Sequence, residues 1–262
     1  MDRWNGRLAL VTGATSGIGA SMAVTLAKKG MKVIGCGRRE ERITELNKEH
    51  GVNIIPYKCD VSQVKEVTKM FDWIKSSKDS FGALSLLVCN AGFSTNQTLM
   101  EGDPNSWIKM MDVNVIAASL ATQLAIKQFL EFAVDDGQIV YINSVYSHKY
   151  PDDGHEFLNF YSASKIANNA LLEMWRKEIT NMQPSNNINI SGICPGYVDT
   201  EFVNAMQKGK SDAEIQAFIE ANKKILTYLQ PNNITDALLY ILSTPPNVQI
   251  NDLIIRPTGK SI

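Results

Sequence analysis

The segment FYSASKIANN, residues 160–169, places Tyr161 four positions before Lys165 in a stretch with helical periodicity. Side chains four residues apart lie on the same face of a helix, so the phenol and the ammonium group are expected to be neighbours. A phenol has an ordinary pKa near ~10, and a nearby positive charge favours its phenolate form. The pair therefore has the residue types and spacing for general acid/base chemistry. The same spacing also occurs by chance on exposed helices, so the surrounding elements must decide.

Length and composition indicate one large soluble domain with a full core, because the chain has 262 residues, 44% hydrophobic and 20% charged. The 26 basic and 27 acidic residues give a formal net charge of −1. This balance argues against a nucleic-acid surface or adhesion to an anionic membrane and favours a small-molecule partner. The beginning, MDRWNGRLALVTG, runs from charged residues into a short apolar strand without a membrane span or a secretory signal. We therefore expect a cytoplasmic protein.

Four cysteines lie far apart in the sequence, at Cys36, Cys59, Cys89 and Cys194. None belongs to a CxxC or Cys/His pattern, so we expect buried, reduced thiols. His148 and His155 are expected to face solvent. With three histidines and no spaced pair of ligands, the sequence predicts no metal site.

Short β-rich runs alternate with longer helical segments along the whole chain, which is typical of parallel strands joined by helical crossovers. The predicted strands are 7–13, 31–37, 53–60, 83–92, 137–144, 187–196 and 252–258, and the predicted helices are 17–30, 39–50, 62–80, 104–134, 158–183 and 231–243. Right-handed crossovers place helices on both faces of the sheet. We therefore expect an α/β fold with a single Rossmann-type domain over 1–262, a doubly wound parallel sheet of about seven strands. Segment 197–230 is the least regular and is expected to cover a bound substrate.

Ligands of such a sheet bind beyond the carboxyl ends of the strands, next to the turn after the first strand. That turn is TGATSGIG, in which Gly13 lets the chain leave the strand sharply, Gly17 lets the backbone approach a pyrophosphate, and Gly19 lets the next helix pack closely. Thr15, Ser16 and Ile18 complete the predicted phosphate contacts at the helix N-terminus. Glycines also form plain turns, but the position between strand and helix favours a dinucleotide. No Lys-Ser/Thr follows the glycines, which excludes a kinase-type phosphate loop.

The end of the second strand indicates the cofactor. A fold that binds NAD usually carries an acid there, whereas this sequence has Arg38 and Arg39 before Glu40. Guanidinium groups suit the 2′-phosphate of NADP(H), because they donate paired charge-assisted hydrogen bonds. The alternative is that both arginines only begin the next helix, although helix N-termini prefer acids.

Taken together, these motifs resemble the short-chain dehydrogenases/reductases. The signatures occur in order as TGATSGIG (12–19), DV (60–61), CNAG (89–92), VNV around Asn114, NS (143–144), YSASK (161–165) and CPGYVDT (194–200). The resemblance covers the whole chain. The ends of the chain and the GCGRR strand end look most like the NADP-dependent branch that contains insect farnesol dehydrogenases and animal ketosteroid/carbonyl reductases.

The resemblance implies a role for each member of the catalytic set. Tyr161 is implied as the general acid/base, and Lys165 as the cation that stabilises its phenolate and holds the nicotinamide ribose. Ser144 is implied to donate a hydrogen bond to the substrate oxygen, together with Tyr161, and Asn114 to support a water-mediated proton relay to Lys165. Each residue alone also has an ordinary structural explanation. Their joint occurrence favours the catalytic interpretation.

Further cofactor contacts follow from the resemblance. They are Asp60 and Val61 beside the adenine, Asn90, Ala91 and Gly92 under the ribose, Pro195, Gly196, Val198 and Thr200 at the nicotinamide carboxamide, and Tyr161 with Lys165. Two residues depart from the pattern, Cys89 where asparagine is commonest and Ser85 where many relatives have an acid. We expect these two to change local stability without loss of activity.

The sequence predicts a lipophilic substrate. Five side chains are expected to line an apolar pocket or, alternatively, to pack loops onto the body: Tyr146, Tyr150, Phe157, Phe202 and Met206. The resemblance implies an NADP(H)-dependent enzyme that interconverts alcohol and carbonyl groups on a terpenoid alcohol such as farnesol or on a steroid ketone. A non-catalytic NADP(H)-binding regulator or scaffold is the alternative. A homodimer or homotetramer through the two long helices is also implied.

Overall fold

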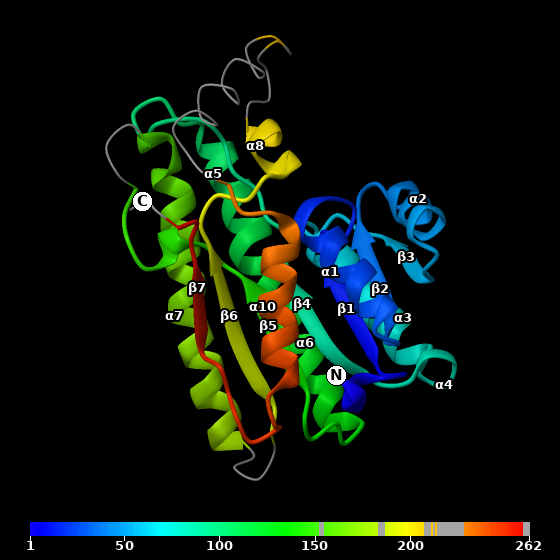
Figure 1. Ribbon diagram of the computed structural model, residues 1–262. Helices are drawn as coiled ribbons and strands as arrows, with labels where there is room; N and C mark the ends of the chain where they lie inside the picture. Colours follow the sequence, from blue (N-terminus) through cyan, green and yellow to red (C-terminus); the bar gives the residue numbers. More distant parts are fainter. Residues whose placement is uncertain (152–154, 183–186, 207–210, 212, 214–227, 259–262) are drawn as a thin grey trace.

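The computed structural model describes residues 1–151, 155–182, 187–206, 211, 213 and 228–258. Within them, seven parallel strands form one sheet in the order β3-β2-β1-β4-β5-β6-β7 (Figure 1). The strands are β1 (Leu8–Thr12), β2 (Lys32–Gly37), β3 (Ile54–Lys58), β4 (Leu84–Cys89), β5 (Gln138–Ile142), β6 (Asn189–Pro195) and β7 (Asp252–Ile255). This confirms the predicted doubly wound α/β sheet.

The strand order reverses between β1 and β4. From β1 the sheet continues to β2 and β3 on one side and to β4, β5, β6 and β7 on the other. The connections that leave β1 and β4 therefore separate at the carboxyl edge and leave a crevice between them. Every functional motif predicted at a strand end lies at this edge.

Helices cover both faces of the sheet (Figure 1). One face carries α1 (Gly17–Lys28), α2 (Glu41–His50) and α10 (Pro231–Ser243), and the other carries α3 (Val64–Ser76), α6 (Ala117–Glu131) and α7 (Asn159–Met182). The alternation of β1 explains the two layers, because Val11 packs with the α1 and α10 side while Leu10 packs with the α3 and α6 side. All five residues of β1 are buried, as expected for a strand covered on both faces.

Short elements complete the described residues: η1 (Asp2–Trp4), α4 (Lys78–Phe81), α5 (Pro104–Met111), η2 (Asp112–Ile116), η3 (Val145–Ser147), η4 (Glu156–Leu158) and α8 (Glu201–Met206). Two predicted helices are divided. The one expected over 62–80 becomes α3 and α4, and the one expected over 104–134 contains the π-helical turn η2 between α5 and α6. Periodicity could not reveal this turn, because it adds one residue without interrupting the helix.

By length and composition, the stretch Pro104–Glu131 is apolar enough to cross a membrane, with a mean hydropathy of 1.3 over its most apolar window. Of that window, 56% is buried inside the protein. Its apolar side chains, such as Ala125 and Phe129, pack against the sheet. Core packing therefore explains the composition.

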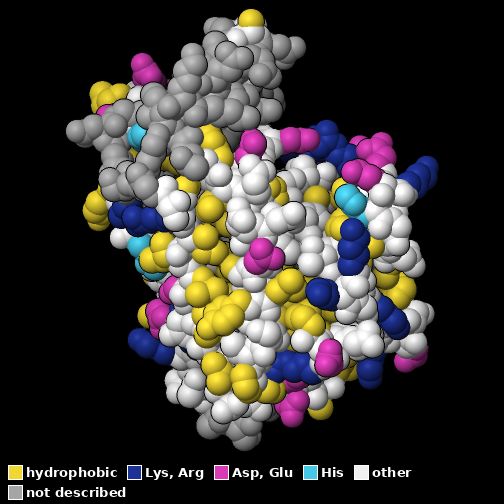
Figure 2. All heavy atoms as spheres, viewed as in Figure 1, with side chains coloured by type: hydrophobic (Ala, Val, Ile, Leu, Met, Phe, Trp, Pro, Cys, Tyr) yellow, Lys and Arg dark blue, Asp and Glu magenta, His cyan; other side chains and the backbone are white. Residues whose placement is uncertain are grey.

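The face that carries α10 and the edge strand β7 shows apolar side chains among polar ones (Figure 2). Tyr240, Val248 and Ile254 are exposed there. The four cysteines are buried and free, which confirms their prediction as reduced thiols.

Candidate active site

The turn after β1 has the conformation that its glycines were expected to permit. Gly13 and Gly17 adopt φ values of 67° and 55°, in the left-handed region that other residues seldom occupy. Gly19 has an ordinary φ, but a Cβ atom there would collide with the carbonyl oxygen of Gly13 and with the Asn90 amide. The turn and the start of α1 are therefore packed too closely for side chains.

Thr12 joins this turn to the one that follows β4. Its Oγ1 accepts hydrogen bonds from the backbone N–H groups of Asn90 (3.0 Å) and Ala91 (3.1 Å), and it donates one to the Val88 carbonyl (3.2 Å). The Asn90 amide donates in return to the carbonyl oxygens of Thr12 (2.9 Å) and Gly13 (3.2 Å). The two strand ends thus form one rigid unit. Thr12 begins the TGATSGIG motif, but the sequence assigned no contact to its side chain.

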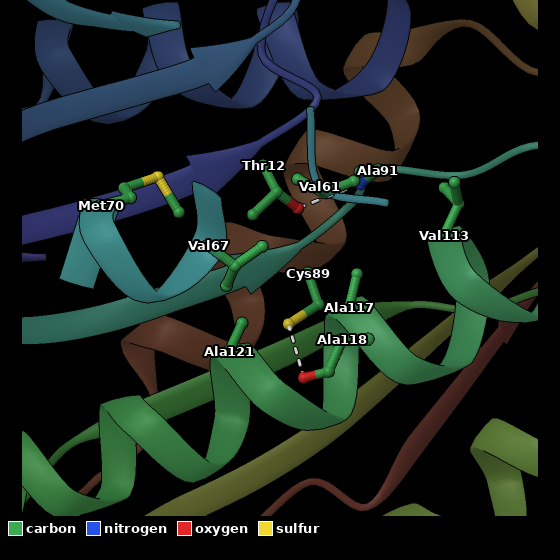
Figure 3. Close-up of a pocket in the computed structure, with 10 residues that line it drawn as sticks. All are labelled: Thr12, Val61, Val67, Met70, Cys89, Ala91, Val113, Ala117, Ala118 and Ala121. Carbon is green, nitrogen blue, oxygen red and sulfur yellow. Dashed lines mark hydrogen bonds between the residues drawn. The ribbon is translucent and has the colours of Figure 1, made fainter. Parts of the chain in front are cut away.

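A small void lies directly behind this unit (Figure 3). It measures about 10 Å³ and is lined mainly by apolar side chains of α3, α6 and the strand ends. Cys89 points into it, with Sγ 3.9 Å from the Ala118 carbonyl oxygen (Figure 3). The void is at most large enough for one water molecule and too small for a ligand. Cys89, which replaces the asparagine that is commonest in the family, therefore lies behind the site and is not part of it.

The large cleft at the carboxyl edge has a volume of about 990 Å³. Most predicted site residues line it: Gly13, Thr15, Ser16, Gly17, Ile18, Arg38, Arg39, Asp60, Val61, Asn90, Ala91, Gly92, Ser144, Tyr161, Lys165, Pro195, Gly196, Val198 and Thr200. The two exceptions are Gly19 and Asn114, which lie behind its wall. Asn143 also lines the cleft; the sequence predicted no role for it beyond the NS signature, and its buried side-chain amide has no hydrogen-bond partner.

One end of the cleft is cationic. Arg38 and Arg39 follow β2 and are exposed, and Arg39 Nη2 lies 3.2 Å from Glu201 Oε2 of α8. Arg42 binds the same carboxylate at 2.7 Å. Burial alone would raise the pKa of Glu201, but hydrogen bonds and charge from Arg42 and Arg39 outweigh it and hold the pKa below its ordinary value. Arg42 and Glu201 were missed, because no spacing relates them to the arginine pair.

At the other end, Ser144, Tyr161 and Lys165 come together. Ser144 follows β5 and caps η3, accepting from the Tyr146 N–H at 3.2 Å, while the other two lie on the first turns of α7. Lys165 is 4% exposed, and its Nζ donates to the Ile142 carbonyl at 2.9 Å. The helix spacing thus brings the predicted phenol and ammonium group to the same site.

The acidity of these groups is dominated by burial. Burial raises the pKa of Tyr161 well above its ordinary value, although a hydrogen bond with Ser144 opposes this. Burial also lowers the pKa of Lys165 to about 8. The sequence led us to expect a phenol made more acidic by Lys165. In this structure desolvation of the ring is the larger effect and has the opposite sign.

Asn114 lies on the π-helical turn and is 2% exposed. Its side chain binds the backbone of Phe93 twice, accepting from N–H at 2.8 Å and donating to the carbonyl at 2.9 Å, and it donates to Ser164 Oγ at 2.9 Å. The Asn114 carbonyl accepts from Asn168 at 2.8 Å. Asn114 therefore positions the segment after β4, and its part in a proton relay stays a prediction.

The rest of the cleft is lined by apolar and aromatic side chains. Tyr146, Phe157, Phe202 and Met206 line it as predicted. The prediction for Tyr150 is wrong, because that side chain is 79% exposed and lies outside the lining. Aromatic and aliphatic neighbours that were not predicted are Phe93, Leu158, Tyr197 and Tyr228. Within the predicted covering segment 197–230, residues 207–210, 212 and 214–227 lie outside the described residues.

The two histidines near the cleft differ from each other. His148 is exposed as expected. His155 is only half-buried, with its ring centroid 5.9 Å from that of Phe157 and 6.0 Å from that of Tyr197. His155 therefore faces solvent only in part, because the aromatic wall of the cleft covers part of its ring.

Comparison with known proteins gives consistent matches over the whole chain. A sequence model of the short chain dehydrogenase family matches residues 7–211. The dehydrogenase/reductase SDR family member 11 of Bos taurus is 38% identical over 98% of both chains, and the farnesol dehydrogenase of Aedes aegypti is 37% identical over 99% of both. A serine dehydrogenase solved in its closed form with NADP+ superimposes with a TM-score of 0.84 at 25% identity, covering 97% of this chain and 96% of the other.

Proposed function

Because the chain belongs to the short-chain dehydrogenase family, whose members are oxidoreductases, we propose that it interconverts alcohol and carbonyl groups on lipophilic small molecules with NADP(H). One observation carries the proposal: the cationic pair Arg38 and Arg39 and the acid/base group Ser144, Tyr161 and Lys165 line the same cleft. A dinucleotide bound along this cleft would have its 2′-phosphate beside the arginines and its nicotinamide ring beside the acid/base group.

The residues present fit NADP(H). The tight turn at Gly13 and Gly17 offers backbone N–H groups at the start of α1, where phosphates are favoured. Arg38 and Arg39 would hold the 2′-phosphate, with Asp60 and Val61 beside the adenine. The unpaired Asn143 amide supplies donor and acceptor atoms on the cleft wall. Relatives solved with NADP support the same choice, including the serine dehydrogenase above.

When bound, NADP(H) supplies or accepts the hydride at the carbonyl carbon. Tyr161 then gives a proton to the carbonyl oxygen during reduction or removes one from the alcohol during oxidation. Its raised pKa keeps the phenol protonated at neutral pH, which suits reduction. Ser144 donates a hydrogen bond where negative charge develops on the substrate oxygen. Lys165, held by the Ile142 carbonyl, places a positive charge beside the phenol.

The aromatic half of the cleft supports a lipophilic substrate. Phe202 lies with its ring centroid 5.8 Å from that of Tyr161, and Tyr146 and Phe157 extend the apolar wall. Large apolar surfaces bind by removal from water, so a terpenoid alcohol such as farnesol or a steroid ketone matches this wall. The similarity to a protein named farnesol dehydrogenase supports the terpenoid choice.

The proposal is tested by following NADPH consumption with aldehydes, quinones and ketosteroids, and NADP+ reduction with farnesol. Tyr161→Phe should lower kcat/KM by about 10²–10⁴-fold while NADPH binding, followed by fluorescence, stays within a few-fold. Tyr150→Phe is the matched control, since Tyr150 is exposed outside the cleft, and should keep full activity. If the wild type binds NADPH but turns over none of these substrates, a non-catalytic regulator or scaffold is favoured. Full activity of Tyr161→Phe would refute the assignment of Tyr161 as the general acid/base.

Two further aspects complete the proposal. The chain acts in the cytoplasm, where NADP(H) and lipophilic carbonyls are both present. It assembles as a homodimer or homotetramer through α6 and α7, a choice supported by Ile166, Met174 and Met182, which are exposed apolar side chains of α7. Size-exclusion chromatography with light scattering measures the assembly state directly.

A further inference from the structure

Three potential metal ligands from separate elements meet behind the substrate end of the cleft. His148 follows η3, Cys194 lies in β6, and Asp252 begins β7. One ligand atom from each lies within 4.8 Å of the others. None of the three has a part in the proposed reaction.

The distances between these atoms suit a tetrahedral ion. His148 Nε2 lies 3.4 Å from Cys194 Sγ. Zinc bonds of about 2.3 Å to sulfur and about 2.0–2.1 Å to nitrogen, at a tetrahedral angle, place the two ligands about 3.5 Å apart. The existing separation therefore needs little change.

The carboxylate of Asp252 has an oxygen atom that is free to bind a cation. Its Oδ1 is buried and has no hydrogen-bond partner. A Cβ atom on residue 192 would collide with this oxygen, so Gly192 leaves the space that the carboxylate occupies. An unpaired buried carboxylate oxygen is costly, and a bound cation would offset that cost.

We propose that His148, Cys194 and Asp252 form a binding site for a single Zn²⁺-class ion. A thiolate, an imidazole and a carboxylate are the ligands that zinc selects, and three protein ligands leave one position for water. Mg²⁺ and Ca²⁺ are disfavoured, because both require mainly oxygen ligands. On binding, the Cys194 S–H proton passes to solvent as the metal–sulfur bond forms, and no redox change occurs. The exposed His148 provides the entry path.

The site connects to the catalytic loop. Ser147 Oγ donates to the Ser144 carbonyl at 2.6 Å and lies 3.6 Å from Cys194 Sγ. Cys194 directly precedes Pro195 and Gly196 of the cleft wall. A bound ion would therefore fix two loops that border the substrate and would stabilise the folded protein.

Titration of the metal-free full-length protein with Co²⁺ tests the proposal. We expect one equivalent to produce the visible bands of tetrahedral Co²⁺ and a thiolate charge-transfer band, and Zn²⁺ to abolish both. Cys194→Ser should remove the charge-transfer band. His148→Ala and Asp252→Asn should each weaken Zn²⁺ binding by at least about 100-fold, beyond the effect of changing an outer-shell residue.

Matched controls are Cys89→Ser and His50→Ala, a buried cysteine and a surface histidine away from the cluster, which should leave binding unchanged. If Cys194→Ser does not fold, the variants at the exposed His148 and the half-buried Asp252, His148→Ala and Asp252→Asn, carry the test. An undiminished spectrum in all three ligand variants, or equal loss in the controls, would overturn the site. The titration measures metal binding in the absence of NADP(H). Its outcome is therefore independent of whether the proposed reaction occurs.

Discussion

The Nζ atom of Lys165 lies 5.6 Å from the centroid of the Tyr161 ring. Lys165 is buried and Tyr161 is half-buried, and burial moves each pKa toward the neutral form: upward for the phenol and downward, to about 8, for the ammonium group. The pair is therefore held together at a cost in folding free energy. Such costs are common where function needs a buried polar group.

The first prediction concerns stability against pH. The pKa of Lys165 is about 8 in the folded protein and 10.5 ordinarily, so from pH 8 to 10 the unfolded chain binds more protons at this residue. The free energy of unfolding should therefore rise with pH, by about 1–2 kcal/mol from this group. Lys165→Met should remove that rise, as measured by urea unfolding at several pH values.

Lys69→Met is the control for this measurement, because Lys69 is an exposed lysine of α3. It should keep the slope of the wild type. Equal slopes for Lys165→Met and the wild type would mean that Lys165 ionises as it does in water.

The second prediction concerns the choice between cofactors. The double substitution Arg38→Asp with Arg39→Leu should weaken NADPH binding by about 10²–10³-fold, since charge-assisted hydrogen bonds contribute about 1.5–3 kcal/mol each. NADH binding should change only a few-fold. Fluorescence titration with both cofactors measures the difference. Lys48→Gln, which removes an exposed charge at the far end of α2, is the control. Equal weakening of NADPH and NADH would refute the 2′-phosphate assignment.

The third prediction concerns Glu201, whose carboxylate binds the guanidinium groups of Arg39 and Arg42. A 2′-phosphate at Arg39 must compete with this carboxylate. Glu201→Gln should therefore tighten NADPH binding by a few-fold, as expected for an exposed ion pair, and leave NADH binding unchanged. Weaker NADPH binding in this variant would show that Glu201 supports the cofactor.

The fourth prediction concerns the size of the substrate. Phe202→Ala should raise KM by about 10–100-fold for bulky apolar carbonyls, because a buried phenylalanine contributes about 1.5–3 kcal/mol. Small aldehydes, which have little apolar surface to bury against this ring, should be affected much less. Steady-state kinetics on bulky carbonyls and on small aldehydes test this prediction. Tyr150→Ala, which changes an exposed aromatic residue, is the control. Proportional losses on large and small substrates would place Phe202 outside the specificity wall.

The sheet and most of the cleft were predictable from sequence, because each depends on local patterns. The apolar run around Val11 followed by Gly13 indicates a buried strand and a tight turn, and parallel strands bring all such turns to one edge. The four-residue spacing of Tyr161 and Lys165 fixes their neighbourhood within a helix. Resemblance then assigned roles to positions that the geometry brought together.

Relationships between distant elements were not predictable in the same way. Glu201 meets Arg42, and Cys194 meets His148 and Asp252, only after the helices and strands have packed. Tyr150 was misplaced because its exposure depends on how the loop after η3 turns, which residue type does not determine. The burial that raises the pKa of Tyr161 is likewise a property of the assembled cleft.

The π-helical turn at Asp112–Ile116 has a consequence for the evolution of the chain. One extra residue within a continuous helix rotates everything before it by about 100° relative to everything after it. Loss of that residue would restore regular hydrogen bonding and yet turn the Asn114 amide away from Phe93. Substitutions along this helix should therefore be tolerated more readily in evolution than insertions or deletions.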